Sequence, residues 1–187
     1  MSYQDVICEW KETAEEFFKT REHIFKEVIS LSIERLRSGN KILVFGNGGS
    51  AAQAQHFAAE LVNRFLKTRP PLRAIALSTD TSALTSIAND SSFDHVFSRQ
   101  VEALGNQGDV ALGLSTSGNS PNMLEAMRAA RERGLITVAL TGKGGGKLGP
   151  LVDYLLDVPS KKTPRIQEIH ILLLHLLAQE IEEKSGS

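Results

Sequence analysis

The sequence has few of the features that mark exported or disulfide-stabilised proteins. It contains one cysteine, Cys8, which leaves no partner for an internal disulfide and suits a reducing cytosol. Its amino terminus carries Asp5, Glu9 and Glu12, where an export signal would have a cationic start and an apolar block. We therefore expect a cytoplasmic protein.

The sequence also lacks long apolar runs and a dominant charge. Stretches such as Ile42 to Phe45 are far shorter than the ~20 residues that a membrane-spanning helix needs. Lys and Arg number 21 against 22 Asp and Glu, so no overall basic field is present to hold nucleic acid. These absences predict a protein with no membrane or nucleic-acid partner.

What is present is typical of one globular domain. The 187 residues are 41% hydrophobic and 23% charged, and we expect a single domain over 1–187. Apolar residues from Val6 to Leu36 recur at steps of three and four, which predicts a helical segment over 1–38. An α/β core is expected over 41–160 and a final helix over 165–183.

The core alternates short apolar runs with helical patterns. We predict buried strands at Lys41–Phe45, Ala74–Leu77, Val110–Leu114, Ile136–Leu140 and Tyr154–Val158. Between them, we predict helices at Ala51–Phe65, Ser82–Ala88, Asp94–Leu104 and Asn122–Arg133. This βαβ alternation predicts an α/β three-layer sandwich built on a five-stranded parallel sheet.

The final helix is apolar around most of its circumference, so it needs burial on several sides. The long first helix also needs a partner for its apolar stripe. We expect a homo-oligomer in which these helices pack across subunits. The alternative is a monomer that uses both helices to cover its own sheet.

Two polar loops follow predicted strands, where open parallel sheets bind ligands. Residues 46–50 (GNGGS) and 115–121 (STSGNSP) each lead into a predicted helix, and Ser120 suits the cap before Pro121. Hydroxyls and amides at a helix amino terminus attract anions, so a phosphate monoester is the natural ligand. Such residues also form ordinary turns. Neither loop has a nucleotide-binding fingerprint.

Two pairs of metal-binding residue types have helical spacing. His56 and Glu60 are four residues apart on one helix face. Gln167 and His175 are eight apart, and their directions differ by only ~80°. Together they could hold Zn²⁺ or a similar ion. The alternative is a set of ordinary polar groups or oligomer contacts.

The remaining histidines give weaker signals. His170 lies ~60° from Gln167 around the helix and competes with His175 for the same place. His23 and His95 belong to no cluster that we recognise.

The sequence resembles the phosphoheptose isomerase family of SIS domain proteins from Lys41 to Ile181. The most specific segments are FGNGGSAAQAQHFAAEL, IAND, FSRQVEALG, GDVALGLSTSGNSPN, LTGKGGG and RIQEIHILLLH. The resemblance implies a flavodoxin-like sheet, a homotetramer, and active sites shared between subunits. It also implies a role in heptose synthesis for lipopolysaccharide or capsule.

The resemblance assigns roles to individual residues. It places the substrate on Asn47, Gly48, Gly49, Ser50, Glu60, Asn89, Asp90, Ser115, Thr116, Ser117, Ser120 and Gln167. It implies one Zn²⁺ per subunit, bound by His56, Glu60, Gln167 and His175. It assigns catalysis to Glu60 and His175.

The implied reaction converts sedoheptulose 7-phosphate to D-glycero-D-manno-heptose 7-phosphate through an enediol. Glu60 is suited to be the base, and His175 can exchange protons with the sugar oxygens. Related adaptors of the replication initiator DnaA share several segments but lack residues that match this pair. A sugar-phosphate sensor would keep the polar loop at 115–121 but would need neither Glu60 nor His175. Pro164 stands where some family members have an acidic residue, and it suits the start of the final helix.

Overall fold

A computed structural model describes residues 2–185. The elements in chain order are α1 (Tyr3–Arg37), β1 (Ile42–Gly46), α2 (Gly49–Val62), β2 (Ala74–Ala76), α3 (Thr81–Asp90), η1 (Phe93–His95), α4 (Ser98–Leu104), β3 (Val110–Ser115), α5 (Pro121–Glu132), β4 (Ile136–Thr141), η2 (Gly149–Leu151), β5 (Tyr154–Asp157) and α6 (Thr163–Ser185). The five predicted strands are all confirmed, each within one residue of its expected bounds.

The strands form one parallel sheet in the order β2-β1-β3-β4-β5. In the pairing of β1 with β3, Gly46 lies opposite Leu114. The loops that follow these strands therefore begin side by side at the carboxyl ends of the strands. This register places both polar loops of the sequence together.

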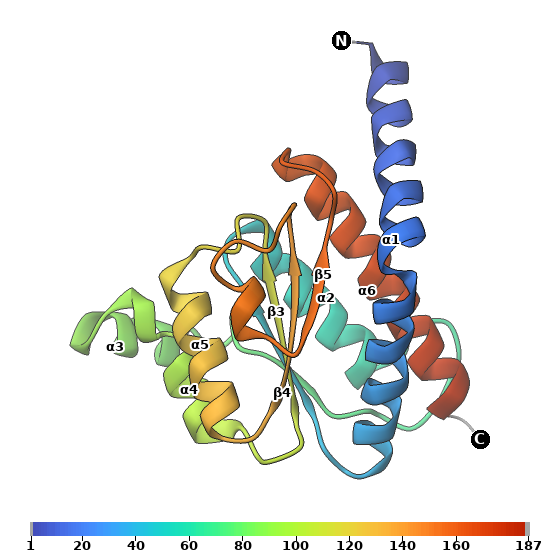
Figure 1. Cartoon of the computed structure of the whole chain (residues 1–187). Helices are drawn as coiled ribbons and strands as arrows, with labels where there is room; N and C mark the ends of the chain where they lie inside the picture. The colour runs from blue at the N-terminus through green and yellow to red at the C-terminus, as the bar shows by residue number, and fades with distance from the viewer. Residues whose placement is uncertain (1, 186–187) are drawn as a thin grey trace.

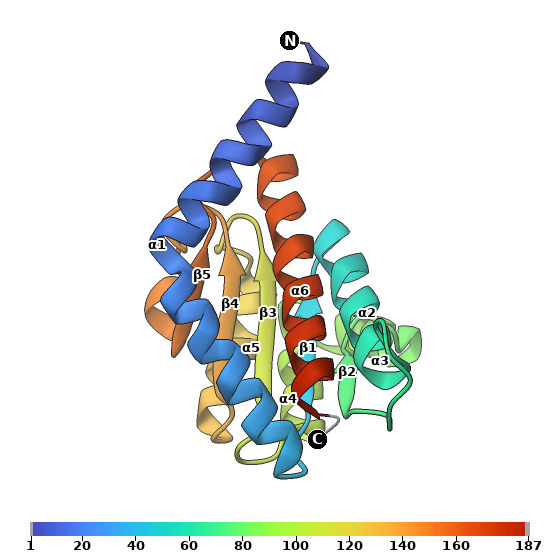
Figure 2. The ribbon, with the colours of Figure 1, turned by 90° about the vertical axis from the view of Figure 1, so that its right-hand side faces the viewer.

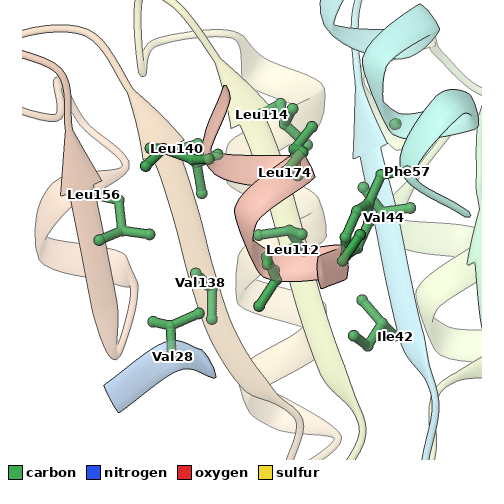
Figure 3. Packing of buried hydrophobic residues seen from close by; sticks show 14 of the residues in the cluster. Val28, Ile42, Val44, Phe57, Leu112, Leu114, Val138, Leu140, Leu156 and Leu174 are labelled. Carbon is green, nitrogen blue, oxygen red and sulfur yellow. The ribbon is translucent and has the colours of Figure 1, made fainter. Parts of the chain in front are cut away.

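Helices cover both faces of the sheet, which confirms the three-layer sandwich (Figure 1). Ile42 and Val44 of β1 pack into a core formed with α1, α2 and α6. Their neighbours Leu43 and Phe45 point to the opposite core, under α4 and α5. Alternation along a buried strand thus supplies side chains to both layers. Figure 3 shows the first core, with Phe57 of α2 beside Val44.

Helix α6 lies between its neighbours, as its apolar circumference requires. It packs against α1 and α2 and also meets β4 (Figure 2). Its buried apolar residues are Ile166, Ile169, Leu173, Leu174, Leu177, Ala178 and Ile181. Burial on several sides is therefore achieved within one chain. None of the described helices has the length and apolarity needed to span a membrane.

The first helix has two different halves. A capping box between Ser2 and Asp5 starts it, and from Thr13 onward its apolar face is buried. Before that point the helix extends beyond the sheet (Figures 1 and 2). There Tyr3, Ile7 and Trp10 are 91%, 56% and 37% exposed. The apolar stripe thus continues past the part of the helix that this chain covers.

The helix predicted at Asp94–Leu104 is wrong as one element. The segment forms the short helix η1, then a break, then α4. Val96 and Phe97 at the break are buried, and the Phe97 ring lies 5.5 Å from that of Phe45. The change of direction between η1 and α4 falls where these two side chains enter the core under α4 and α5.

Candidate active site

The serine loop, residues 115–120, is a tight turn between β3 and α5. The Gly118 N–H donates to the Ser115 carbonyl and hydroxyl, both at 3.2 Å, and the Asn119 N–H donates to Ser117 Oγ at 3.2 Å. Ser120 occupies the N-cap of α5 as predicted, but its hydroxyl makes no capping hydrogen bond. This geometry leaves a hydroxyl at the helix start, where an anion would bind.

A second loop supports the serine loop from outside. Gly118 has φ +64°, and a Cβ at that position would lie 2.1 Å from the Gly145 carbonyl oxygen. The Leu148 N–H donates to the Gly118 carbonyl, and the Lys147 N–H donates to Asn119 Oδ1. The glycine-rich segment 142–148 therefore packs directly on the serine loop.

A small cavity of about 80 Å³ lies where the two polar loops meet. It is lined by Asn47, Ser50, Leu114, Ser115, Thr116, Ser117, Ser120 and Gln167. Liquid water occupies about 30 Å³ per molecule, so this space suits a phosphate group rather than a whole seven-carbon sugar. The cavity brings together most of the residues that the sequence predicted around the phosphate.

Asn47 is joined to a residue that the sequence did not single out. Its side-chain amide exchanges two hydrogen bonds with the amide of Asn122, at 2.9 and 2.8 Å. Asn122 is 2% exposed, at the start of α5. The pair ties the loop after β1 to the first turn of α5. Nothing in the sequence marks Asn122, because an asparagine in the first turn of a helix is common.

A histidine cluster lies further along α2. His56 Nε2 is 2.8 Å from His175 Nε2 and 3.4 Å from Glu60 Oε1. Glu60 is partly buried, whereas His56 is largely exposed. Helices α2 and α6 thus bring these three side chains together within one chain.

The environment of His175 lowers the pKa of its imidazole below the ordinary value. Burial is the main cause, because desolvation disfavours the charged ring, and the neighbouring His56 acts in the same direction. The Glu60 carboxylate opposes both by favouring the cation. At neutral pH the His175 ring is therefore mainly neutral, a form that can both donate and accept a proton.

Gln167 lies at the cavity end of this arrangement. A Cβ on Gly49 would lie 2.7 Å from Gln167 Nε2, so a larger residue there would displace that amide. The backbone carbonyl of Gln167 accepts a hydrogen bond of 2.7 Å from Gln53 Nε2. Gln53 Oε1 is buried with no hydrogen-bond partner. Sequence reasoning missed Gln53, although it stands one turn before His56 on α2.

Other predicted residues lie elsewhere. Asn89 and Asp90 lie at the end of the exposed helix α3 and do not line the cavity. The Asn89 side-chain amide donates a hydrogen bond of 2.8 Å to the Asp90 carboxylate. His170 is fully buried, with Nε2 3.2 Å from the Thr141 carbonyl, so it does not compete with His175. His95 Nδ1 forms an exposed hydrogen bond of 2.8 Å with Ser91 Oγ.

Comparisons with known proteins agree with this fold. The sequence model of the SIS domain matches residues 7–142. Phosphoheptose isomerase from Nitratidesulfovibrio vulgaris is 54% identical over 175 residues, which cover 90% of this chain and 84% of the relative. Phosphoheptose isomerase from Helicobacter pylori is 54% identical over 172 residues, covering 92% and 90%.

A solved structure gives the same result. The phosphoheptose isomerase GmhA from Neisseria gonorrhoeae is 48% identical, and it superposes with a TM-score of 0.90 over 96% of both chains. The parallel sheet, its flanking helices and the sequence match define a SIS domain protein. Within that class, the chain belongs to the phosphoheptose isomerase family.

Proposed function

We propose that this enzyme interconverts sedoheptulose 7-phosphate and D-glycero-D-manno-heptose 7-phosphate. The observation that carries the proposal is the pairing of a phosphate-sized cavity with a cluster of proton-transfer groups on the same two helices. Ser50 and His56 are separated by six residues of α2, or about 9 Å along its axis. An extended seven-carbon chain with bonds near 1.5 Å spans about 8 Å, so one substrate reaches both ends.

The serine loop holds the phosphate. Its hydroxyls and amides, with the amino terminus of α5, balance the negative charge without a lysine or arginine. Anchoring the remote phosphate fixes the reacting carbons near Glu60, and such positioning supplies several kcal/mol of barrier reduction. This binding role falls on Ser115, Thr116, Ser117 and Ser120.

Two side chains carry the proton transfers. The Glu60 carboxylate removes a proton from C1 of the ketose, exchanges it with solvent at the enediol stage and delivers a proton to C2, while the His175 imidazole moves the hydroxyl proton from O1 to O2. The C2 carbonyl thereby becomes a hydroxyl and C1 becomes the aldehyde, through an enediol. A mainly neutral His175 suits this exchange, because a neutral imidazole has one donor and one acceptor nitrogen.

The residues around Glu60 fit zinc in their chemistry. Two imidazole nitrogens and a carboxylate oxygen face one another, and these are preferred zinc ligands. Among the described residues, however, no group of three or more His, Cys, Asp or Glu is arranged to hold an ion. The two imidazoles are in direct contact, with their Nε2 atoms 2.8 Å apart.

We infer that His56, Glu60 and His175 would hold one Zn²⁺ per subunit, with Gln167 as the fourth predicted ligand. When bound, the ion would polarise the sugar oxygens and stabilise enediolate charge. The exposed amino-terminal part of α1 and the distant Asn89 and Asp90 support a homotetramer with shared sites. We propose that the enzyme acts in the cytoplasm and supplies heptose for lipopolysaccharide or capsule.

The test is a proton NMR assay in D₂O with sedoheptulose 7-phosphate, run before and after chelation and again with added zinc. The expected result is an aldoheptose 7-phosphate that carries solvent deuterium at C2, with turnover restored by zinc. Glu60→Gln is the control. Binding without turnover under all conditions would instead favour a sugar-phosphate sensor, and absence of both would favour a DnaA adaptor.

A further inference from the structure

The segment after α2 is fastened to α6 by one buried carboxylate. Glu182 is 3% exposed and accepts hydrogen bonds from three consecutive backbone N–H groups. The Phe65 N–H reaches Oε1 at 2.8 Å, while the Leu66 and Lys67 N–H groups reach Oε2 at 2.7 and 2.8 Å. These bonds stabilise the anion, and they keep the pKa of this carboxyl below its usual range against the opposing effect of burial.

A buried arginine completes the clamp. The Arg69 side chain is 4% exposed, and its Nε lies 3.4 Å from Glu182 Oε1. Its other nitrogens bind the end of α2, where Nη2 donates to the Glu60 carbonyl at 2.7 Å and Nη1 donates to the Leu61 carbonyl at 2.8 Å. Glu182 and Arg69 therefore connect α6, the loop and the backbone of Glu60.

The same loop also contacts His175. The Phe65 ring lies 5.6 Å from the His175 ring at an interplanar angle of 31°. Phe65 is the first of the three residues whose N–H groups Glu182 holds. One clamp thus fixes the backbone of the predicted base and the packing of the predicted acid.

Stability alone is a weak reason for this arrangement. Replacing a buried ion pair with packed apolar residues is often neutral or stabilising. Of the apolar side chains in this loop, Phe65 and Leu72 are partly buried against the core, whereas Leu66 is 65% exposed. The clamp orders a mainly exposed segment whose buried contacts lead to Glu60 and His175.

We propose that Glu182 and Arg69 are positioning residues that hold Glu60 and Phe65, and through Phe65 the His175 ring, in their working geometry. The proposal rests on the isomerase function given above. Neither residue reaches the serine-loop cavity. Loss of the clamp should therefore slow the chemical step and leave phosphate binding intact.

The first test compares Glu182→Gln with Glu183→Gln, its exposed neighbour on α6. Glutamine keeps one acceptor oxygen and places an amide donor against either the loop N–H groups or Arg69. We expect kcat to fall roughly ten- to a hundredfold, with KM for sedoheptulose 7-phosphate within about twofold of the parent. Glu183→Gln should match the parent in both. An unchanged kcat in folded Glu182→Gln would overturn the proposal.

The second test does not depend on turnover. The Phe65 ring, 5.6 Å from that of His175, should shift the ring-proton resonances of His175. Comparison with His175→Gln assigns these resonances among those of the five histidines. At fixed pH, Glu182→Gln should move them in the direction that Phe65→Leu does, and Glu183→Gln should not. Resonances that stay at the parent position in Glu182→Gln would also overturn the proposal.

Two outcomes distinguish a failure of this proposal from a failure of the proposed isomerase function. If the parent chain shows no isomerisation, the proposed function fails, while the resonance comparison still decides whether the clamp sets the His175 environment. If Glu182→Gln does not fold, Phe65→Leu takes its place in the kinetic test, since Phe65 is only half-buried. Parent-like kcat in Phe65→Leu would then overturn the positioning role.

Discussion

The two ends of the candidate site are built in different ways. The serine-loop end consists of backbone turns and short side chains from adjacent loops, and the glycine-rich segment 142–148 packs directly on it. The histidine end consists of longer side chains from α2 and α6, more than one hundred residues apart in sequence. His56 at this end is largely exposed.

This difference suggests a division of labour. A rigid cradle of amides and hydroxyls suits a fixed anion, whose charge does not change during the reaction. Proton transfer instead needs groups whose charge changes, placed where their pKa values can be tuned. Changes at the two ends should therefore affect different kinetic constants.

The largest expected effect is at the histidine end. Glu60→Gln keeps the size of the side chain but removes the base, so kcat should fall about a thousandfold, within the range for loss of a general base. KM should stay within about twofold because the phosphate cradle is untouched. Steady-state kinetics on zinc-loaded protein of measured metal content tests this. Retained turnover would exclude Glu60 as the base.

The second prediction concerns the buried side of α6, between the two ends. Burial lowers the pKa of His170 to about 4. An unfolded histidine takes up its proton near pH 6.5, so acidification favours the unfolded chain between about pH 6.5 and 4. The His170 contribution to the free energy of unfolding is complete above that window and should fall by about 2 kcal/mol by pH 5.

Urea unfolding at pH 7 and pH 5 measures this loss, and His170→Gln is the comparison. The side-chain amide of glutamine can donate to the Thr141 carbonyl from the place of the His170 Nε2 atom, but it does not titrate. His175 has a lowered pKa as well and remains in both proteins, so the difference between them isolates His170. An equal loss of stability in both proteins would contradict the prediction.

A smaller effect is expected at the serine-loop end. Ser117→Ala removes a hydroxyl that lines the cavity and accepts the Asn119 N–H. We expect KM to rise about tenfold, which corresponds to about 1.4 kcal/mol, with little change in kcat. Ser117→Ala would then change mainly KM, whereas Glu60→Gln would change mainly kcat. A fall in kcat with unchanged KM would remove the contrast between the two ends.

The serine-loop end could be predicted from local sequence. Strand patterns located β1 and β3, and the residues after them are typical turn and cap formers, so residues 46–50 and 115–120 were placed correctly. Asn122 could not be predicted, because its partnership with Asn47 depends on strand order. The break before α4 was missed because the burial of Val96 and Phe97 is a tertiary effect.

The histidine end was only partly predictable. Spacing on α2 indicated His56 with Glu60, but their approach to His175 depends on how α6 crosses α2. Similarly, a glutamate near the end of α6 gives no sign that its carboxylate will receive three N–H groups from the loop after α2. Side chains that meet across long sequence separations leave no local pattern.

The last prediction asks whether the two ends belong to one chain. His56, Glu60 and His175 meet within a chain, so mixing Glu60→Gln and His175→Gln subunits should restore no activity. Asp90 lies away from the cavity, and a shared site would take it from a neighbouring subunit. Mixing Glu60→Gln with Asp90→Ala should then restore about a quarter of the sites, since each site draws the two residues independently. Recovery in the first mixture would place Glu60 and His175 of one site on different chains. No recovery in the second would assign Asp90 to its own chain's site, and activity of Asp90→Ala alone would assign it to none.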